Sequence, residues 1–410
     1  MLPFDKISLA AGRQDRGLFA LSARFVVLML LMLPVPQVAA DTLQQALDAY
    51  WLRQPQAQAM SARLDSAAAG KSQADGVLAG APTLALSRRD QRDGASRETE
   101  LEMAWPLSGN RDDRQRQAAA TVVATEADAS LLRVQLAAEL IRIDSERKFR
   151  SEQLALATAR LQLTEALQRD VSQKVAAGEL ARADLLTAQT ETLAATTVRL
   201  GAEQAAEEAL SQWQWRTGNS NELIDPVDVP VSTDVDNNPQ WQRAKALAQA
   251  AAARSHFEQR RSGDIELSLL LRREEDPVLD EQIDSAGLRI SVPLFAGAGR
   301  SQAVADAEAE RLQADAEAKR VLLTLAQEQQ QARRYWQRSA EQVALMQQQQ
   351  QLAEQSLQLA QAAFAAGETT LAERLRVQQR LFDSREALSL QRKQQRDALA
   401  RLIEAEGVLP

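Results

Sequence analysis

The sequence contains no cysteine and one histidine among 410 residues, and aromatic residues make up only 4% of it. Without cysteine, neither disulfide bonds nor cysteine-ligated metals can stabilise the fold, and a lipid anchor on an N-terminal cysteine is excluded. The lone His256 lacks the sequence context of a catalytic triad and is expected on a helix surface. Carboxylates are scattered along helix faces rather than paired. We therefore predict that the chain is no enzyme and has no cofactor and no metal site.

Long apolar runs are also missing after residue 41, where no stretch reaches the 18 residues of a membrane-spanning helix. The first forty residues differ, because Arg13, Arg16 and Arg24 precede an apolar run over 25–33 and a small-residue end at 38–40. This pattern predicts a secretory signal peptide over 1–40, with an anchoring or buried apolar helix as the alternative. The exported chain would be periplasmic, secreted, or held in the outer membrane by strands. A net charge of −8 argues against nucleic acid as a partner.

What the sequence does contain is an internal repeat. Ala, Leu, Gln, Glu and Arg dominate, which is the composition of long helices. Three landmarks recur in the same order at nearly constant distance, which indicates a duplication. They are Pro55 and Pro239, 184 residues apart; Pro106 and Pro293, 187 apart; and Gly178 and Gly367, 189 apart.

Each half contains one very long stretch without proline, residues 110–177 and 300–366. At a rise of 1.5 Å per residue, such a stretch forms a helix of roughly 100 Å. Each ends at a glycine suited to a positive φ, Gly178 or Gly367, and a second amphipathic run follows directly, so each half is a helical hairpin. The remaining helices are expected over 182–216 and 371–406, the return limbs, and within 42–78 and 240–262, the short helices that complete the bundle.

Ahead of each long helix the hydrophobic period changes from 3.6 to 2, which predicts β-hairpins at about 83–106 and 265–293. Their polar loops are expected at about 90–98 and 274–286. Strands of about nine residues with one apolar face have the length of outer-membrane barrel strands, but four cannot close a barrel. A trimer would supply twelve. A small periplasmic sheet that caps a coiled coil is the alternative on this pattern alone.

The predicted fold is therefore mainly α with a small β part. It contains two repeated long helical hairpins and four amphipathic strands. The family resemblance described below implies that the hairpins form an α-helical barrel and that the strands complete a trimeric 12-stranded outer-membrane β-barrel. The predicted domains are the signal peptide (1–40), the first repeat (41–217), a linker or equatorial segment (218–239) and the second repeat (240–410).

Both halves run in the order short helix, β-hairpin, Pro-Leu turn, long helix, Gly-Glu tip and return helix, and in this they resemble the TolC family of outer-membrane factors. The motifs Trp-Pro-Leu-Ser-Gly-Asn-Arg at 105–111 and Val-Pro-Leu-Phe-Ala-Gly-Ala-Gly-Arg at 292–300 are similar to the paired strand-to-helix motifs of that family. The resemblance covers essentially the whole mature chain. Within the family, the modest length and the form of the first motif are most similar to the subgroup that serves heavy-metal cation pumps.

The resemblance assigns candidate roles to particular residues. An acidic constriction six positions after each tip glycine falls on Asp184 and Glu373, whereas two further family positions fall on Arg376 and Thr369 and depart from the pattern. A ring of such carboxylates would concentrate cations; the alternative is a pair of solvated first-turn acids stabilised by the helix macrodipole. The other assigned sites are the adaptor-contact tips Gly178, Glu179, Leu180, Gly367, Glu368 and Thr369, and the strand-to-helix turns Pro106, Gly109, Pro293, Gly297 and Gly299.

By the same resemblance the chain is expected to be a passive exit duct of a tripartite efflux system in the outer membrane of a Gram-negative bacterium, with a long periplasmic portion and no lipid. Its expected partners are two further copies of itself, a periplasmic adaptor (membrane fusion protein), an inner-membrane transporter of the RND type and outer-membrane lipid. The expected cargo is small solutes, with heavy-metal cations favoured over drugs. The alternatives are the channel of a type I protein secretion system and a periplasmic coiled-coil adaptor or scaffold.

Overall fold

The computed structural model describes residues 43–90, 96–220, 235–261, 265–276, 280–292 and 299–409. The predicted signal peptide and most of the linker at 218–239 lie outside these ranges. The elements in chain order are α2 (Leu43–Arg53), α3 (Pro55–Asp75), β1 (Thr83–Asp90), β2 (Arg97–Leu107), α4 (Arg111–Ala176), α5 (Arg182–Thr217), the 3₁₀ turn η2 (Val235–Asn237), α6 (Pro239–Arg260), β3 (Ile265–Asp276), β4 (Glu281–Ser291), α7 (Arg300–Ala365) and α8 (Leu371–Glu406).

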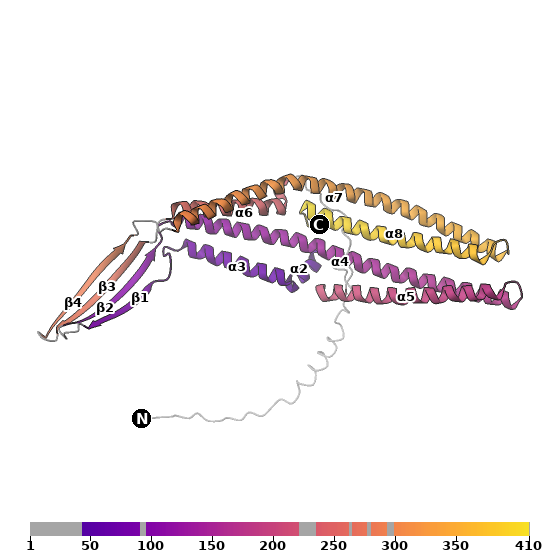
Figure 1. Ribbon diagram of the computed structural model, residues 1–410, viewed down its shortest axis with the longest axis horizontal. Helices are drawn as coiled ribbons and strands as arrows, with labels where there is room; N and C mark the ends of the chain where they lie inside the picture. Colours follow the sequence, from indigo (N-terminus) through magenta and orange to yellow (C-terminus); the bar gives the residue numbers. More distant parts are fainter. Residues whose placement is uncertain are drawn as a thin grey trace, which may run out of the picture.

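The molecule is a long rod with the β-sheet at one end and two helical tips at the other (Figure 1). Helices α4 and α7 have 66 residues each and run along most of the rod. At 1.5 Å per residue each is about 100 Å long. Both begin and end within one residue of the stretches predicted from the missing prolines, and the repeated helical hairpin is confirmed.

The helices lie side by side in one layer (Figure 1). Helix α4 packs against α3 and α5 on one side and against α6 and α8 on the other, and α7 packs against α6 and α8. The short helices stand end to end with the return limbs, α3 with α5 and α6 with α8 (Figure 1). The order across the layer is therefore α3/α5, α4, α6/α8, α7.

The main hydrophobic core lies at mid-length, where α2 fills the break between α3 and α5. Trp213 of α5 and Tyr50 of α2 are at most 1% exposed there, together with Leu140 of α4 and Ile403 of α8. These are among the largest fully buried side chains of the described residues. Fewer large side chains are buried elsewhere along the helices, so this core is the main point at which the helices of the layer are fixed to one another.

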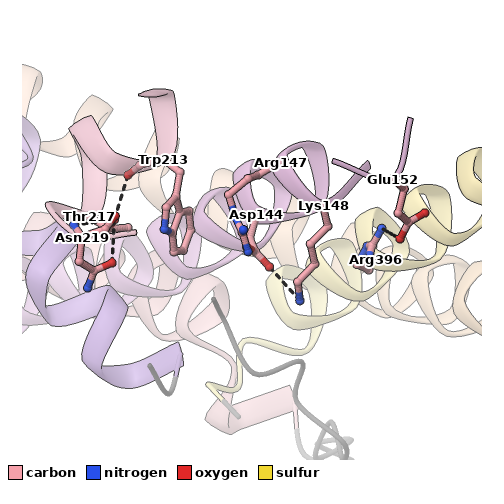
Figure 2. Close-up of polar contacts among 8 residues, drawn as sticks. All are labelled: Asp144, Arg147, Lys148, Glu152, Trp213, Thr217, Asn219 and Arg396. Atoms are coloured by element: carbon pink, nitrogen blue, oxygen red, sulfur yellow. Dashed lines mark hydrogen bonds and ion pairs between the residues drawn. The ribbon is translucent and has the colours of Figure 1, made fainter. Parts of the chain in front are cut away.

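A buried ion cluster borders this core (Figure 2). The Asp144 carboxylate is 2% exposed and accepts hydrogen bonds from Arg147 Nε (3.0 Å) and Nη2 (2.7 Å), while Lys148 Nζ lies 3.1 Å away. The spacing i, i+3 and i, i+4 places all three on one face of α4. The Arg147 guanidinium lies 5.6 Å from the Trp213 ring centre. A buried carboxylate is tolerated here because both of its oxygens are paired.

A second polar contact fixes α6 to α7. Arg311 donates to the Glu308 carboxylate, and so does Ser255 Oγ of α6, at 3.0 Å from Oε2. These two hydrogen bonds lower the pKa of Glu308 to about 2. The carboxylate therefore stays charged, and the contact stays formed, over the whole physiological pH range.

The sheet is antiparallel with strand order β1-β2-β3-β4. The first hairpin agrees with the prediction, but the loop expected at 274–286 was placed wrongly, since β3 continues to Asp276 and β4 begins at Glu281. The alternating apolar pattern stops at Leu271, whereas the backbone pairing does not. Arg273 opposes Asp284 across the strands, with Nε 2.8 Å from Oδ1, so the sheet extends beyond its apolar part.

Replacing Trp213 with Ala tests the mid-length core. The change leaves a large cavity between α2, α4 and α8 and removes the ring that Arg147 covers, so we expect a loss of about 3–5 kcal/mol in the free energy of unfolding. Thermal and denaturant unfolding followed by circular dichroism would measure it. Trp213→Phe should retain most of the stability, and equal stability of the Ala variant and the unaltered protein would contradict this view of the core.

Candidate functional site: helical tips and an amphipathic sheet

The two tips have the same backbone geometry. Gly178 and Gly367 adopt φ of 80° and 78°, as predicted for glycines that end a helix. The next amide in each tip, of Glu179 or Glu368, donates to the carbonyl five residues earlier, at 2.8 and 2.9 Å. This is the Schellman pattern, in which a left-handed glycine reverses the chain and satisfies the last carbonyls of the helix.

The remaining tip residues differ in exposure. Glu179 and Glu368 are exposed, whereas Leu180 and Thr369 are half-buried. Leu180 packs against a cluster that includes Leu167 of α4. The tips therefore present two glycines and two carboxylates outward at the end of the rod.

The two tips are joined to each other. Leu167 and Val171 of the first hairpin form one apolar cluster with Phe364 and Leu371 of the second. Arg374 of α8 lies over the Phe364 ring at 4.9 Å.

An ion pair adds to this contact. Arg374 Nη1 is 3.2 Å from Asp170 Oδ2 of α4, and the Arg374 side chain is 11% exposed. Lys174 of α4 approaches the same Phe364 ring, with Nζ 5.0 Å from its centre. The sequence reasoning missed this contact, since Asp170 and Arg374 are 204 residues apart. The one aromatic residue near either tip, Phe364, was the available signal.

The two gate candidates occupy equivalent positions in the first turns of α5 and α8. Asp184 Oδ2 accepts a hydrogen bond from the Ala181 amide at 3.2 Å. The Glu373 amide donates to Thr370 Oγ1 at 3.3 Å, and its carboxylate pairs with Arg376 at 2.6 Å. No ion pair involves Asp184 within the described part of the chain. The two carboxylates therefore differ in electrostatic environment, because only Glu373 has a cation beside it.

The strand-to-helix turns are held by repeated contacts. Pro106 is the penultimate residue of β2, and its carbonyl accepts from the Ala79 amide at 2.7 Å. Gly109 lies in the turn before α4, and Gly299 precedes α7 with a φ of −76°. Pro293 and Gly297 lie outside the described residues.

Two arginines that are one repeat apart stabilise these turns. Arg111, the first residue of α4, donates to the Asp75 carbonyl at the end of α3 at 2.6 Å. Arg300, the first residue of α7, donates to the Gln259 carbonyl near the end of α6 at 2.8 Å. A cation at the carbonyl end of a helix satisfies free acceptors and complements the dipole. The paired motifs seen in the sequence thus share a structural role.

One face of the sheet is apolar across all four strands, because the register aligns the alternating apolar positions. Directly paired residues project from the same face. Three cross-strand rows make up this face: Leu84, Met103, Leu269 and Leu288; Leu86, Leu101, Leu271 and Ala286; and Trp105, Leu267 and Ile290. Every residue of β1 and β4 is exposed. Within the described residues no helix or loop covers the apolar face.

The opposite face of the sheet is polar and carries cross-strand ion pairs. Arg289 of β4 is 2.9 Å from Glu102 of β2, and Arg272 of β3 is 3.0 Å from Glu98 of β2. The sheet therefore separates a continuous apolar surface from a charged one. That arrangement suits a wall between lipid and water.

Two kinds of feature are not found among the described residues. No described helix is both long and apolar enough to cross a membrane. Within the same ranges, no three acidic, histidine or cysteine side chains are grouped closely enough to hold a metal ion.

Comparisons with known proteins show that this chain is similar to outer membrane channels. Residues 236–408 match the model of the family described as outer membrane efflux protein. The fold is similar to that of the CmeC outer membrane channel of Campylobacter jejuni, with a TM-score of 0.74 and 15% identity over 89% of this chain and 85% of that one. It is also similar to the outer membrane protein VceC of Vibrio cholerae, with a TM-score of 0.71 and 18% identity over 89% and 96%.

A third similar structure is the open state of the MtrE outer membrane channel of Neisseria gonorrhoeae, with a TM-score of 0.71 and 14% identity over 89% of this chain and 88% of that one. No individually curated protein sequence matched the chain. Residues 236–408 thus match the outer membrane efflux protein family, and 89% of the chain shares the fold of these outer membrane channels. This family consists of passive channels rather than enzymes.

Replacing Gly178 or Gly367 with Ala tests the tip geometry. Beyond the adjoining residues of the chain, no atom lies within 4 Å of the added methyl group, so the cost is conformational. A left-handed Ala should lower the free energy of unfolding by about 1–2 kcal/mol. Thermal unfolding would measure the loss, and Asn at either position should cost less because it tolerates a positive φ. Full stability of both Ala variants would show that the tips do not need this backbone conformation.

Proposed function

We propose that this protein is the passive exit duct of a tripartite efflux system. Three copies close a twelve-stranded barrel in the outer membrane, and their helical layers close a duct through the periplasm. A periplasmic adaptor and an inner-membrane transporter of the RND type meet the tips, and the duct exports small solutes, with heavy-metal cations favoured over drugs. The signal peptide over 1–40 would direct the chain out of the cytoplasm, and no lipid anchors it.

This proposal rests on one observation: the β-sheet and the helical layer each have two open edges, and these edges lie on the same two sides of the chain. In the sheet, β1 and β4 each have one unpaired edge. In the helical layer, α3/α5 form one border and α7 the other. Figure 1 places β1 on the α3 side and β4 on the α7 side. Joining β4 and α7 of one copy to β1 and α3/α5 of the next is a head-to-tail contact, which closes into a ring when the rotation fits.

The apolar face of the sheet supports an outer-membrane location. On β3 the apolar positions run from Ile265 to Leu271, six steps of about 3.3 Å or roughly 20 Å along the strand. That length is comparable to the lipid-facing band of about 25 Å in outer-membrane barrels. Beyond it, Arg273 and Asp284 pair on the same face toward the loops, where a charged pair would meet the polar headgroup region.

The tips support the proposed partners. They lie at the end of the rod opposite the sheet, so a sheet in the outer membrane would direct them toward the inner membrane (Figure 1). The exposed Glu179 and Glu368 beside the two glycines offer charged contacts to an adaptor. We infer that Leu180 and Thr369, which are half-buried, fix the shape of the tips at this contact.

A deletion strain tests the cargo. Loss of the gene should lower tolerance of divalent metal salts more than tolerance of lipophilic drugs, and a plasmid copy should restore it. Growth across a concentration series of each compound measures the effect. Sensitivity to drugs alone would reject the preference for metal ions, and unchanged tolerance with loss of a secreted polypeptide would favour the type I secretion channel.

Asp184 is the stronger candidate for a cation-concentrating ring, because Arg376 offsets the charge of Glu373. A unit charge 4–8 Å from a permeating ion contributes about 0.5–1 kcal/mol in water, so Asp184→Asn should lower the cation-to-anion permeability ratio roughly two- to fivefold. Reversal potentials in planar bilayers would measure it.

The matched variants are Glu373→Gln, which should change the permeability ratio less, and Arg376→Gln, which should raise it by freeing Glu373. An unchanged ratio for Asp184→Asn would leave Asp184 as a first-turn acid that stabilises α5.

A further inference from the structure

Two rows of exposed leucines lie on the open borders of the helical layer. Both rows repeat every seven residues, the spacing of a packed coiled-coil seam. On α5 they are Leu186, Leu193 and Leu200, which are 57%, 69% and 53% exposed, and on α7 they are Leu345, Leu352 and Leu359, which are 59%, 64% and 73% exposed. Single exposed leucines are common on protein surfaces, but regular rows of them indicate a contact surface.

Both rows face away from the packing partners inside the chain. On α5, Ala188 is 1% exposed and belongs to the apolar cluster shared with α4. Leu186 is two residues before it, about 200° around the helix. On α7, Leu357 is 6% exposed and Leu359 follows it by the same two residues. Each row is therefore on the side where a ring would place the neighbouring copy.

The two rows also lie at matching distances from the tips. Leu186, Leu193 and Leu200 follow Gly178 by 8, 15 and 22 residues, and Leu359, Leu352 and Leu345 precede Gly367 by the same three numbers. The tips lie at the same height, because Asp170, 8 residues before Gly178, pairs with Arg374, 7 residues after Gly367, at 3.2 Å. Placed side by side and antiparallel, the two rows would meet rung by rung.

The repeat provides an independent test inside the chain. In the contact between α4 and α8, the first limb of one hairpin packs against the return limb of the other. A contact between α7 of one copy and α5 of the next would join the same two kinds of limb. The residues 189 positions after Leu193 and Leu200 are Phe382 and Ser389 of α8, and these are only 2% and 3% exposed. Both contact α4, Phe382 through the Arg160 guanidinium and Ser389 through a 2.7 Å hydrogen bond to Glu152. The α5 positions are thus the equivalents of positions that α8 buries.

The exposed positions of the two rows lack charge, although Glu191 and Arg199 of α5 and Glu354 of α7 lie half-buried in the same stretches. Every exposed residue of α5 from Leu186 to Leu200 is uncharged, and so is every exposed residue of α7 from Leu345 to Leu359. Charged residues make up 25% of the whole chain. Depletion of charge at the centre of a surface is typical of an interface rather than of a solvated helix face.

We propose that these rows form the seam between neighbouring copies of this chain. Leu186 of one copy packs against Leu359 of the next, Leu193 against Leu352, and Leu200 against Leu345, in a three-rung leucine ladder that closes the periplasmic duct near its tips. The inference rests on the trimeric duct proposed above and assigns its residues and its register.

The absence of cysteine makes disulfide mapping direct. Leu193→Cys is combined with Leu345→Cys, Leu352→Cys or Leu359→Cys in three variants, and each is oxidised in membranes and run on non-reducing gels. Adjacent rungs are about 10 Å apart along the helix, and a disulfide needs Cα atoms within about 7 Å. Cross-linked dimers and trimers should therefore form in highest yield with Leu352→Cys. Leu193→Cys alone should give none, because a head-to-tail seam does not bring a residue to its own copy.

The oligomeric state of each reduced variant, measured by light scattering, separates the two proposals. A trimer that cross-links best through position 352 supports the ladder. A trimer that cross-links best through position 345 or 359, or through none of the three, overturns the ladder and leaves the trimeric duct standing. A monomer overturns both.

Discussion

A single copy of this chain cannot cover its own apolar surfaces, and its other features depend on that constraint. The four-stranded sheet has one apolar face and two open edges, and the helical layer has two open borders with rows of exposed leucine. A soluble monomer with so much exposed apolar surface would be prone to aggregation. Lipid on one face of the sheet and further copies at both borders account for all of these surfaces together.

The internal repeat explains how one chain can supply so much of a ring. The contact between α4 and α8 is already a contact between two hairpins, with the Asp170–Arg374 ion pair and the shared cluster around Phe364 at its tip end. The proposed contact between copies uses the equivalent limbs of the same two hairpins. Three copies would then form six hairpins joined by two alternating kinds of seam. One seam, between α4 and α8, lies within a single chain and is stabilised by the core around Trp213. The other, between α5 and α7 of neighbouring copies, would form only on assembly. The seam within the chain contains ion pairs, whereas the exposed positions of the proposed seam between copies carry no charge.

Much of the fold could be predicted because its signals are local. The missing prolines defined α4 and α7 almost to the residue, and Gly178 and Gly367 marked the two tips. Alternation of apolar residues found all four strands, but it failed at the second loop, where the pairing of Arg273 with Asp284 continues the sheet beyond the apolar positions.

The candidate site was less predictable, because it depends on residues far apart in the chain. Arg374 and Asp170 come together only through the register of α8 on α4, which no local pattern specifies. The sequence analysis named Glu373 as a gate residue and Arg376 as a departure from the family pattern. It did not pair the two, although their i, i+3 spacing was readable in the sequence.

The central claim is that three copies of this chain close into one ring. Electron cryomicroscopy of the protein extracted from outer membranes tests it most directly. The account predicts a threefold particle with one continuous twelve-stranded sheet, and a monomer, or a sheet left open at β1 and β4, would contradict it.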